Sequence, residues 1–153
     1  MKPLPAPSRA LGAEELLAKA RALEPLLSAQ APLNEARGRL TEEAFGALRE
    51  AGLLAMLVPE CFAGAEANTL EALEIIEALS YADGSTGWVQ MATQVCTSLA
   101  AACLPAASAK ALFNGVTPVI AGQGAPNGQA EVAVRNGQRG FLLSGHWSYG
   151  SGV

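Results

Sequence analysis

The segment from Thr86 to Ala102 constrains the fold most, because it carries no Asp, Glu, Lys or Arg over several turns of a helical pattern. Its apolar residues leave no polar face: Trp88, Val89, Met91, Ala92, Val95, Cys96, Leu99 and Ala102. A helix that is apolar on every side is normally buried on every side. We therefore predict a central, fully buried helix, whose small side chains let neighbouring helices pack close to it.

Four further helical patterns accompany this segment. Pro25 interrupts the first of them, which predicts either a kink or two shorter helices. Thr41 and Asp83 are capping residues, and they are placed to begin the second pattern and the central helix. Apart from the central segment, the predicted helices run from about Gly12 onward, from Thr41 to Gly52, from Thr69 to Tyr81 and from Ala106 to Phe113.

The hydrophobic period changes after Thr117 and becomes that of strands. Val119 to Gly124 is predicted to be a strand. Val132 and Val134 alternate with other residues before Asn136-Gly137, which is a strong hairpin signal. A further strand is predicted from Phe141, continuing through the small and aromatic residues up to Gly150. Because so few strands with an open edge are marginal alone, we expect the sheet to continue in residues that this sequence lacks.

These patterns predict a mainly α fold with a β part at the C-terminal end. We expect residues 1–10 to form a flexible tail and residues 11–116 to form a helical domain. Residues 117–153 are expected to begin a β-domain that is incomplete here.

Composition excludes several classes of function. The formal net charge is −4 and only 16% of residues are charged, so no basic face for nucleic acid is expected. No apolar run reaches the length that spans a bilayer, and Met1 to Ala10 does not have the pattern of a signal peptide. We therefore expect a cytoplasmic protein with no membrane partner. The cysteines are odd in number and widely spaced, which predicts incidental or buried thiols and no metal site.

The usual catalytic patterns are missing from the sequence. His146 is the only histidine, it is expected on the outward side of a strand, and it completes no Ser/His/Asp set. The G-x-G of Gly122 to Gly124 is followed by a strand pattern, so it fails as a dinucleotide fingerprint. Three segments nevertheless combine glycine with tryptophan, tyrosine or serine, which are residues suited to a planar ring: residues 82–89, 122–128 and 144–152.

Two of these segments and one helical stretch carry a family resemblance. Residues 47–53 read A-L-R-E-A-G-L and lead to V-P-E at residues 58–60, which resembles the N-terminal helical domain of acyl-CoA dehydrogenases. Ala63-Gly64 stands where that family has paired glycines. The D-G-S-T-G-W of residues 83–88 and the S-G-H-W-S-Y-G-S-G of residues 144–152 resemble the two-component flavin-dependent monooxygenases of the same superfamily.

The resemblance implies an activity and its partners. A separate flavin reductase would supply reduced flavin, FMN or FAD, and the oxygenase would use it with dioxygen on a small aromatic or heteroaromatic substrate. A homotetramer is implied for the full-length enzyme. We expect this chain alone to be inactive, since the remaining flavin contacts of the family lie in later segments.

The same resemblance implies roles for particular residues. Ser148 and Ser151 are the candidate catalytic hydroxyls. Cys96 stands where some relatives have a histidine, and it receives no role. The candidate cofactor-binding residues are Trp88, Gly124, Ala125, Pro126, Trp147, Ser148 and Tyr149.

Two alternatives remain open at this stage. An acyl-CoA dehydrogenase would show T-E-P-x-x-G-S-D, and the acidic residues and serine of that motif are missing from residues 124–130. The second alternative is a helical interaction module without catalysis, in which the open strand edge would be a partner surface.

Overall fold

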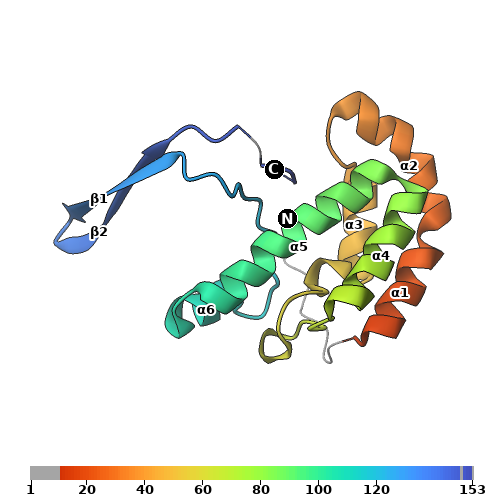
Figure 1. The fold of residues 1–153 in the computed structure, drawn as a ribbon, viewed down its shortest axis with the longest axis horizontal. Helices are drawn as coiled ribbons and strands as arrows, with labels where there is room; N and C mark the ends of the chain where they lie inside the picture. The colour runs from red at the N-terminus through yellow and green to blue at the C-terminus, as the bar shows by residue number, and fades with distance from the viewer. Residues whose placement is uncertain (1–10, 149, 153) are drawn as a thin grey trace.

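The structure is a computed structural model that describes residues 11–148 and 150–152. A helical body is followed by a hairpin that extends away from it (Figure 1). The elements are α1 (Ala13–Ala22), α2 (Glu24–Arg37), α3 (Glu42–Glu50), two 3-10 turns η1 (Leu53–Ala55) and η2 (Glu60–Phe62), α4 (Thr69–Ala82), α5 (Gly84–Cys103), α6 (Ala106–Leu112), β1 (Gly128–Arg135) and β2 (Gln138–Gly145). The predicted mainly α fold with a β part is confirmed.

Local signals placed the helix ends correctly. The pattern around Pro25 resolves into two helices, with Leu23 between them and Pro25 near the start of α2. The Thr41 side chain caps α3 by accepting a hydrogen bond from the Ala44 amide at 3.1 Å. Gly52 adopts the left-handed conformation with φ 81°, as expected for the residue after this helix.

The core of the helical body lies between α1, α2, α3, α4 and η1. One apolar cluster joins these elements, and burying its side chains is the main source of their stability. The cluster has its most completely buried large side chains at Leu16, Leu27, Leu48, Leu53, Met56, Ile75 and Leu79.

A single residue, Asp83, joins α4 to α5. It ends α4, and its carboxylate caps α5 by accepting hydrogen bonds from the Ser85 and Thr86 amides. The same carboxylate accepts a hydrogen bond from Asn34 Nδ2 of α2 at 2.9 Å. Burial raises the pKa of the Asp83 carboxyl, but the hydrogen bonds that it accepts outweigh burial and leave the pKa below its ordinary value of 3.8.

Helix α5 differs from the prediction that it is buried on all sides. Its buried side chains are mostly polar, and they face the helical body: Thr86, Gln90, Thr93, Gln94 and Thr97. Its large apolar side chains Trp88, Val95 and Leu99 are exposed. The segment therefore has a mostly polar buried face and an apolar exposed face.

The buried polar face of α5 is anchored to η1 by two glutamine amides. Gln94 Nε2 donates to the Leu54 carbonyl at 2.7 Å, and Gln90 Nε2 donates to the Leu53 carbonyl. Gln94 Oε1 also accepts a hydrogen bond from the Leu57 amide. These bonds satisfy backbone groups in and after a short 3-10 turn and both polar ends of the Gln94 side chain, whereas the buried Gln90 Oε1 has no hydrogen-bond partner among the described residues.

The turn after η2 accounts for one departure noted in the sequence. Ala63 has φ 61°, in the left-handed region that strongly favours glycine, so alanine is accommodated there at some cost in backbone energy. A Cβ atom at Gly64 would collide with the carbonyl group of Val58. Where the family has paired glycines, position 64 therefore requires glycine for steric reasons, whereas position 63 accepts alanine.

The β part is a two-stranded antiparallel hairpin in which Val132 pairs with Phe141. Asn136 and Gly137 both have positive φ, so the predicted turn is confirmed. The predicted strand at residues 119–124 is wrong, because no strand among the described residues lies beside it to pair. Strand β2 ends at Gly145, although a strand was predicted to continue to Gly150. Gly145 pairs with Gly128, the first residue of β1, so the residues after Gly145 have no partner in β1.

Other expectations concern isolated residues. Cys61 and Cys103 are exposed and Cys96 is partly buried, and all three are free thiols. His146 is exposed, as expected, but it follows the strand and does not lie in it. Within the described part of the chain, no helix is long and apolar enough to cross a membrane, and no cluster of possible metal ligands is found.

Candidate functional site

Two segments separated by the hairpin turn meet beside α5 and border an open pocket of about 560 Å³. One is the extended stretch before β1, and the other is the chain that follows β2. The pocket is lined by Ala121, Gly122, Gln123, Leu143, Trp147, Ser148 and Gly150. Its volume is within the range of small-molecule sites.

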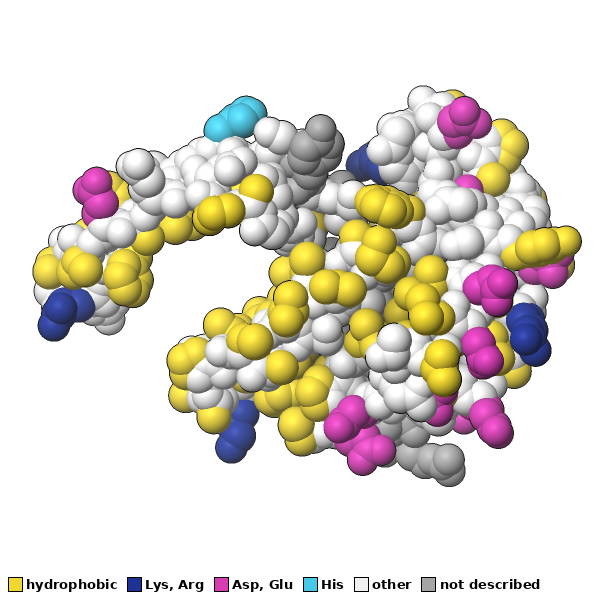
Figure 2. All heavy atoms as spheres, in the orientation of Figure 1, with side chains coloured by type: hydrophobic (Ala, Val, Ile, Leu, Met, Phe, Trp, Pro, Cys, Tyr) yellow, Lys and Arg dark blue, Asp and Glu magenta, His cyan; other side chains and the backbone are white. Residues whose placement is uncertain are grey.

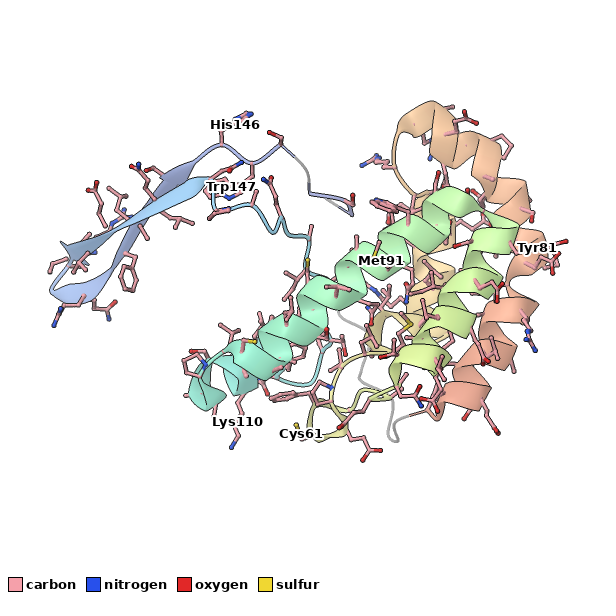
Figure 3. All side chains as sticks on the ribbon, in the orientation of Figure 1. Cys61, Tyr81, Met91, Lys110, His146 and Trp147 are labelled. Atoms are coloured by element: carbon pink, nitrogen blue, oxygen red, sulfur yellow. The ribbon has the colours of Figure 1, made fainter. Side chains whose placement is uncertain are left out.

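Trp147 forms one wall of this pocket, and its position depends on two glycines. A Cβ atom at Gly128 would approach the Trp147 ring to 2.5 Å, and one at Gly145 would approach it to 2.9 Å. The ring therefore packs on bare backbone where the two strands begin and end. Figure 3 shows Trp147 on the side of the chain that faces the stretch before β1, and His146 on the opposite side.

The floor of the pocket lies close to α5 because of a third glycine. A Cβ atom at Gly122 would lie 2.8 Å from Cys96 Sγ. The Ile120 amide donates to Thr97 Oγ1 at 3.1 Å and fixes the same stretch on the helix. Cys96 thus supports the backbone of the pocket.

The chain after the pocket returns to α5 through Ser151 and Gly152. Trp88 Nε1 donates a hydrogen bond to Ser151 Oγ at 2.9 Å. Gly152 packs on Thr93, where a Cβ atom would collide with the threonine methyl group. Two candidate residues from the sequence, Trp88 and Ser151, are therefore bonded to each other.

The remaining candidate residues fall into three groups. Trp147 and Ser148 both line the pocket, and Ser148 is exposed there. Gly124, Ala125 and Pro126 are exposed and follow directly after the lining stretch, without contributing to the lining. Tyr149 lies outside the described residues.

The pocket offers hydrogen bonding and ring contact, and its lining residues carry no ionisable side chain. The Ser148 hydroxyl, backbone groups and the indole face of Trp147 line it, which suits a neutral planar ligand. Gly122 and Gln123 belong to the segment 122–128 predicted to suit a planar ring, whereas Ala121 and Leu143 were not predicted to line the pocket. The contact between Gly122 and Cys96 depends on tertiary packing that no local pattern encodes.

Apolar surface extends outward from this site. Figure 2 shows apolar side chains on the side of the hairpin that faces α5 and along the facing side of α5 and α6. On the hairpin, the register places Val132, Phe141 and Leu143 on one face, and all three are more than 60% exposed. Trp88, Val95 and Leu99 are the large apolar side chains exposed on α5.

Comparison with known proteins identifies the family to which this fold belongs. Residues 12–121 match the family model described as acyl-CoA dehydrogenase, N-terminal domain. The chain therefore belongs to the acyl-CoA dehydrogenase N-terminal domain family. This result confirms the resemblance drawn from residues 47–60.

Individual relatives narrow the comparison to monooxygenases. The chain is 33% identical to an indole-3-acetate monooxygenase of Pseudomonas putida over 114 residues, which are 74% of this chain and 28% of that protein. It is 28% identical to the flavin-dependent monooxygenase oxygenase subunit HsaA of Rhodococcus jostii over 131 residues, 86% of this chain and 33% of that protein. The chain thus spans about a third or less of the length of these relatives.

A solved structure agrees with the sequence relatives. The HsaA monooxygenase of M. tuberculosis superposes with a TM-score of 0.81 at 26% identity. The superposition covers 93% of this chain and 38% of that one, so both the helical body and the start of the β part belong to the shared fold.

Proposed function

We propose that this chain is the N-terminal part of the oxygenase component of a two-component flavin-dependent monooxygenase that acts on an aromatic substrate. Membership of the family and the similarity to two named monooxygenases support this proposal. The single structural observation that carries it is the uncharged pocket between the stretch 121–123 and the Trp147–Ser148 segment.

The proposed cofactor is a reduced flavin, FMN or FAD, supplied by a separate flavin reductase. When bound, the flavin supplies the activation of dioxygen, and the protein's part is to hold the ring and exclude water. Trp147 would contact a face or edge of the ring. The Ser148 hydroxyl and the backbone amides of Ala121 and Gly122 would bond its polar edge.

The wider arrangement follows from the same proposal. Residues 11–116 would form the helical domain and residues 117–153 the start of the β-domain. Leu143 of the apolar hairpin face lines the pocket, and the exposed apolar side chains of α5 lie across from that face, so together they would surround the ring and the aromatic substrate with apolar surface. A cytoplasmic location and a homotetrameric full-length enzyme are part of the proposal.

Titration of the isolated chain with FMN and FAD, oxidised and reduced, tests this proposal. We expect weak binding with no turnover, because this chain offers only one side of the pocket. FMN and FAD should bind equally, since the pocket contacts only the ring they share. Trp147→Ala should abolish the change in the flavin spectrum, whereas Tyr81→Ala, on the distant exposed side of α4, should not. Binding that survives Trp147→Ala would contradict the placement of the ring.

A further inference from the structure

The hydrogen bond between Trp88 and Ser151 has only one possible direction. An indole nitrogen is a donor and never an acceptor, so Trp88 Nε1–H donates and Ser151 Oγ accepts at 2.9 Å. A serine hydroxyl has one hydrogen to donate. Because the bond from Trp88 occupies an acceptor position, the Ser151 hydrogen is left to point toward a different acceptor. The described residues contain no acceptor that it is bonded to.

The position of Ser151 is fixed by α5 in a second way. Gly152, the next residue, has φ 94° and packs directly on Thr93 and Val89. Trp88 lies on the same helix, so the turn formed by Ser151 and Gly152 is held to α5 at two points. Ser151 directly follows Gly150, which lines the pocket.

The other candidate hydroxyl has no such arrangement. Ser148 is exposed in the pocket wall, and its side chain has no hydrogen bond within the described part of the chain. It is therefore able to rotate and to act as donor or acceptor. The structure thus distinguishes two serines that sequence reasoning treated as equivalent.

We propose that Trp88 is a positioning residue that presents the Ser151 hydroxyl as a hydrogen-bond donor to an acceptor atom of a heteroaromatic ring bound beside α5. This inference rests on the proposed function, in which the ring is a flavin. Trp88 acts through Ser151, and its indole nitrogen makes no bond to the ligand itself.

The first test needs no ligand, because the chain contains only two tryptophans. In the ¹⁵N-labelled protein, each indole N–H gives one NMR signal, and Trp88→Phe identifies the signal of Trp88. Ser151→Ala should move that signal and speed its exchange with solvent, whereas the matched control Ser148→Ala should leave it in place. A Trp88 signal that is unchanged in Ser151→Ala would overturn the inference.

The second test measures binding of reduced FMN under anaerobic conditions by the shifts of backbone amide signals. Loss of one hydrogen bond should weaken binding by roughly two- to tenfold in Ser151→Ala. Trp88→Phe should weaken it by the same factor, the double variant should be no weaker than either, and Ser151→Thr should restore binding. If the double variant instead weakened binding by the product of the two single factors, Trp88 would not act through Ser151.

The two tests separate the positioning role from the proposed function. A wild-type chain that binds no flavin at any concentration would contradict the flavin site. The indole signal would still decide whether Trp88 orients Ser151.

Discussion

The helical body and the hairpin treat apolar side chains in opposite ways. In the body, Leu16 and Ile75 are fully buried, whereas in the hairpin Phe141 is 74% and Val132 66% exposed. Both regions have the hydrophobic period of their secondary structure. The hydrophobic period therefore identifies a helix or strand and the face that carries its apolar side chains. It does not show whether other residues of this chain bury that face. Helix α5 lies at the junction of these regions and combines both behaviours.

The largest expected effect comes from truncating a buried side chain of the body. Ile75→Ala should lower the free energy of unfolding by about 2–5 kcal/mol, because it removes a side chain with no exposed surface and leaves a cavity. Phe141→Ala in the hairpin should change it by less than about 0.5 kcal/mol. Urea unfolding followed by circular dichroism measures both. Equal losses of unfolding free energy in the two variants would show that the apolar face of the hairpin is covered in solution. That result would contradict the difference in burial between the two regions.

An intermediate effect is expected at the joint between α4 and α5. Asp83→Ala removes the cap and should cost about 1–2 kcal/mol at neutral pH. Asp83→Asn keeps an acceptor oxygen and should cost less.

The same joint predicts a pH dependence. Because the folded pKa of Asp83 is below 3.8, the unfolded state binds the proton more readily. The contribution of the carboxylate is fully present above pH 3.8 and is lost as the pH falls through the lower, folded pKa. The stability difference between wild type and Asp83→Asn should therefore shrink below pH 3.8. A difference that stays constant in acid would contradict the role of the charge.

The smallest effect on global stability is expected within the hairpin. Gly128→Ala places a methyl group against the Trp147 ring and should displace that ring from the pocket. Global unfolding should change by less than about 1 kcal/mol, since the hairpin contributes little to the core. Trp147 fluorescence, measured in a Trp88→Phe background, should nevertheless shift toward that of a more exposed indole. Gly124→Ala is the matched control, because a Cβ atom there meets nothing within 4 Å.

Local chemistry explains which parts of the fold the sequence predicts. Thr41, Asp83 and Asn136-Gly137 act on their own neighbours, so the helix starts and the hairpin turn are predictable. The burial of Gln90 and Gln94 was not predictable, because it depends on carbonyl groups of η1 more than thirty residues earlier.

The candidate site was predictable only in part, for the same reason. Trp147 and Ser148 stand out by residue type and do line the pocket. The bond between Trp88 and Ser151 joins residues 63 positions apart, and only the fold brings them together.

The single-residue joint at Asp83 has a consequence for the length of the chain around it. An α-helix turns by about 100° per residue, so one residue inserted between Asp83 and Trp88 would rotate the rest of α5 by that angle. The glutamine amides would leave the carbonyl groups of η1, and Trp88 would turn away from Ser151. Substitutions in this stretch change one contact each, but an insertion or deletion would change all of them together. The spacing from Asp83 to Gln94 is therefore a constraint as strict as the identity of any residue within it.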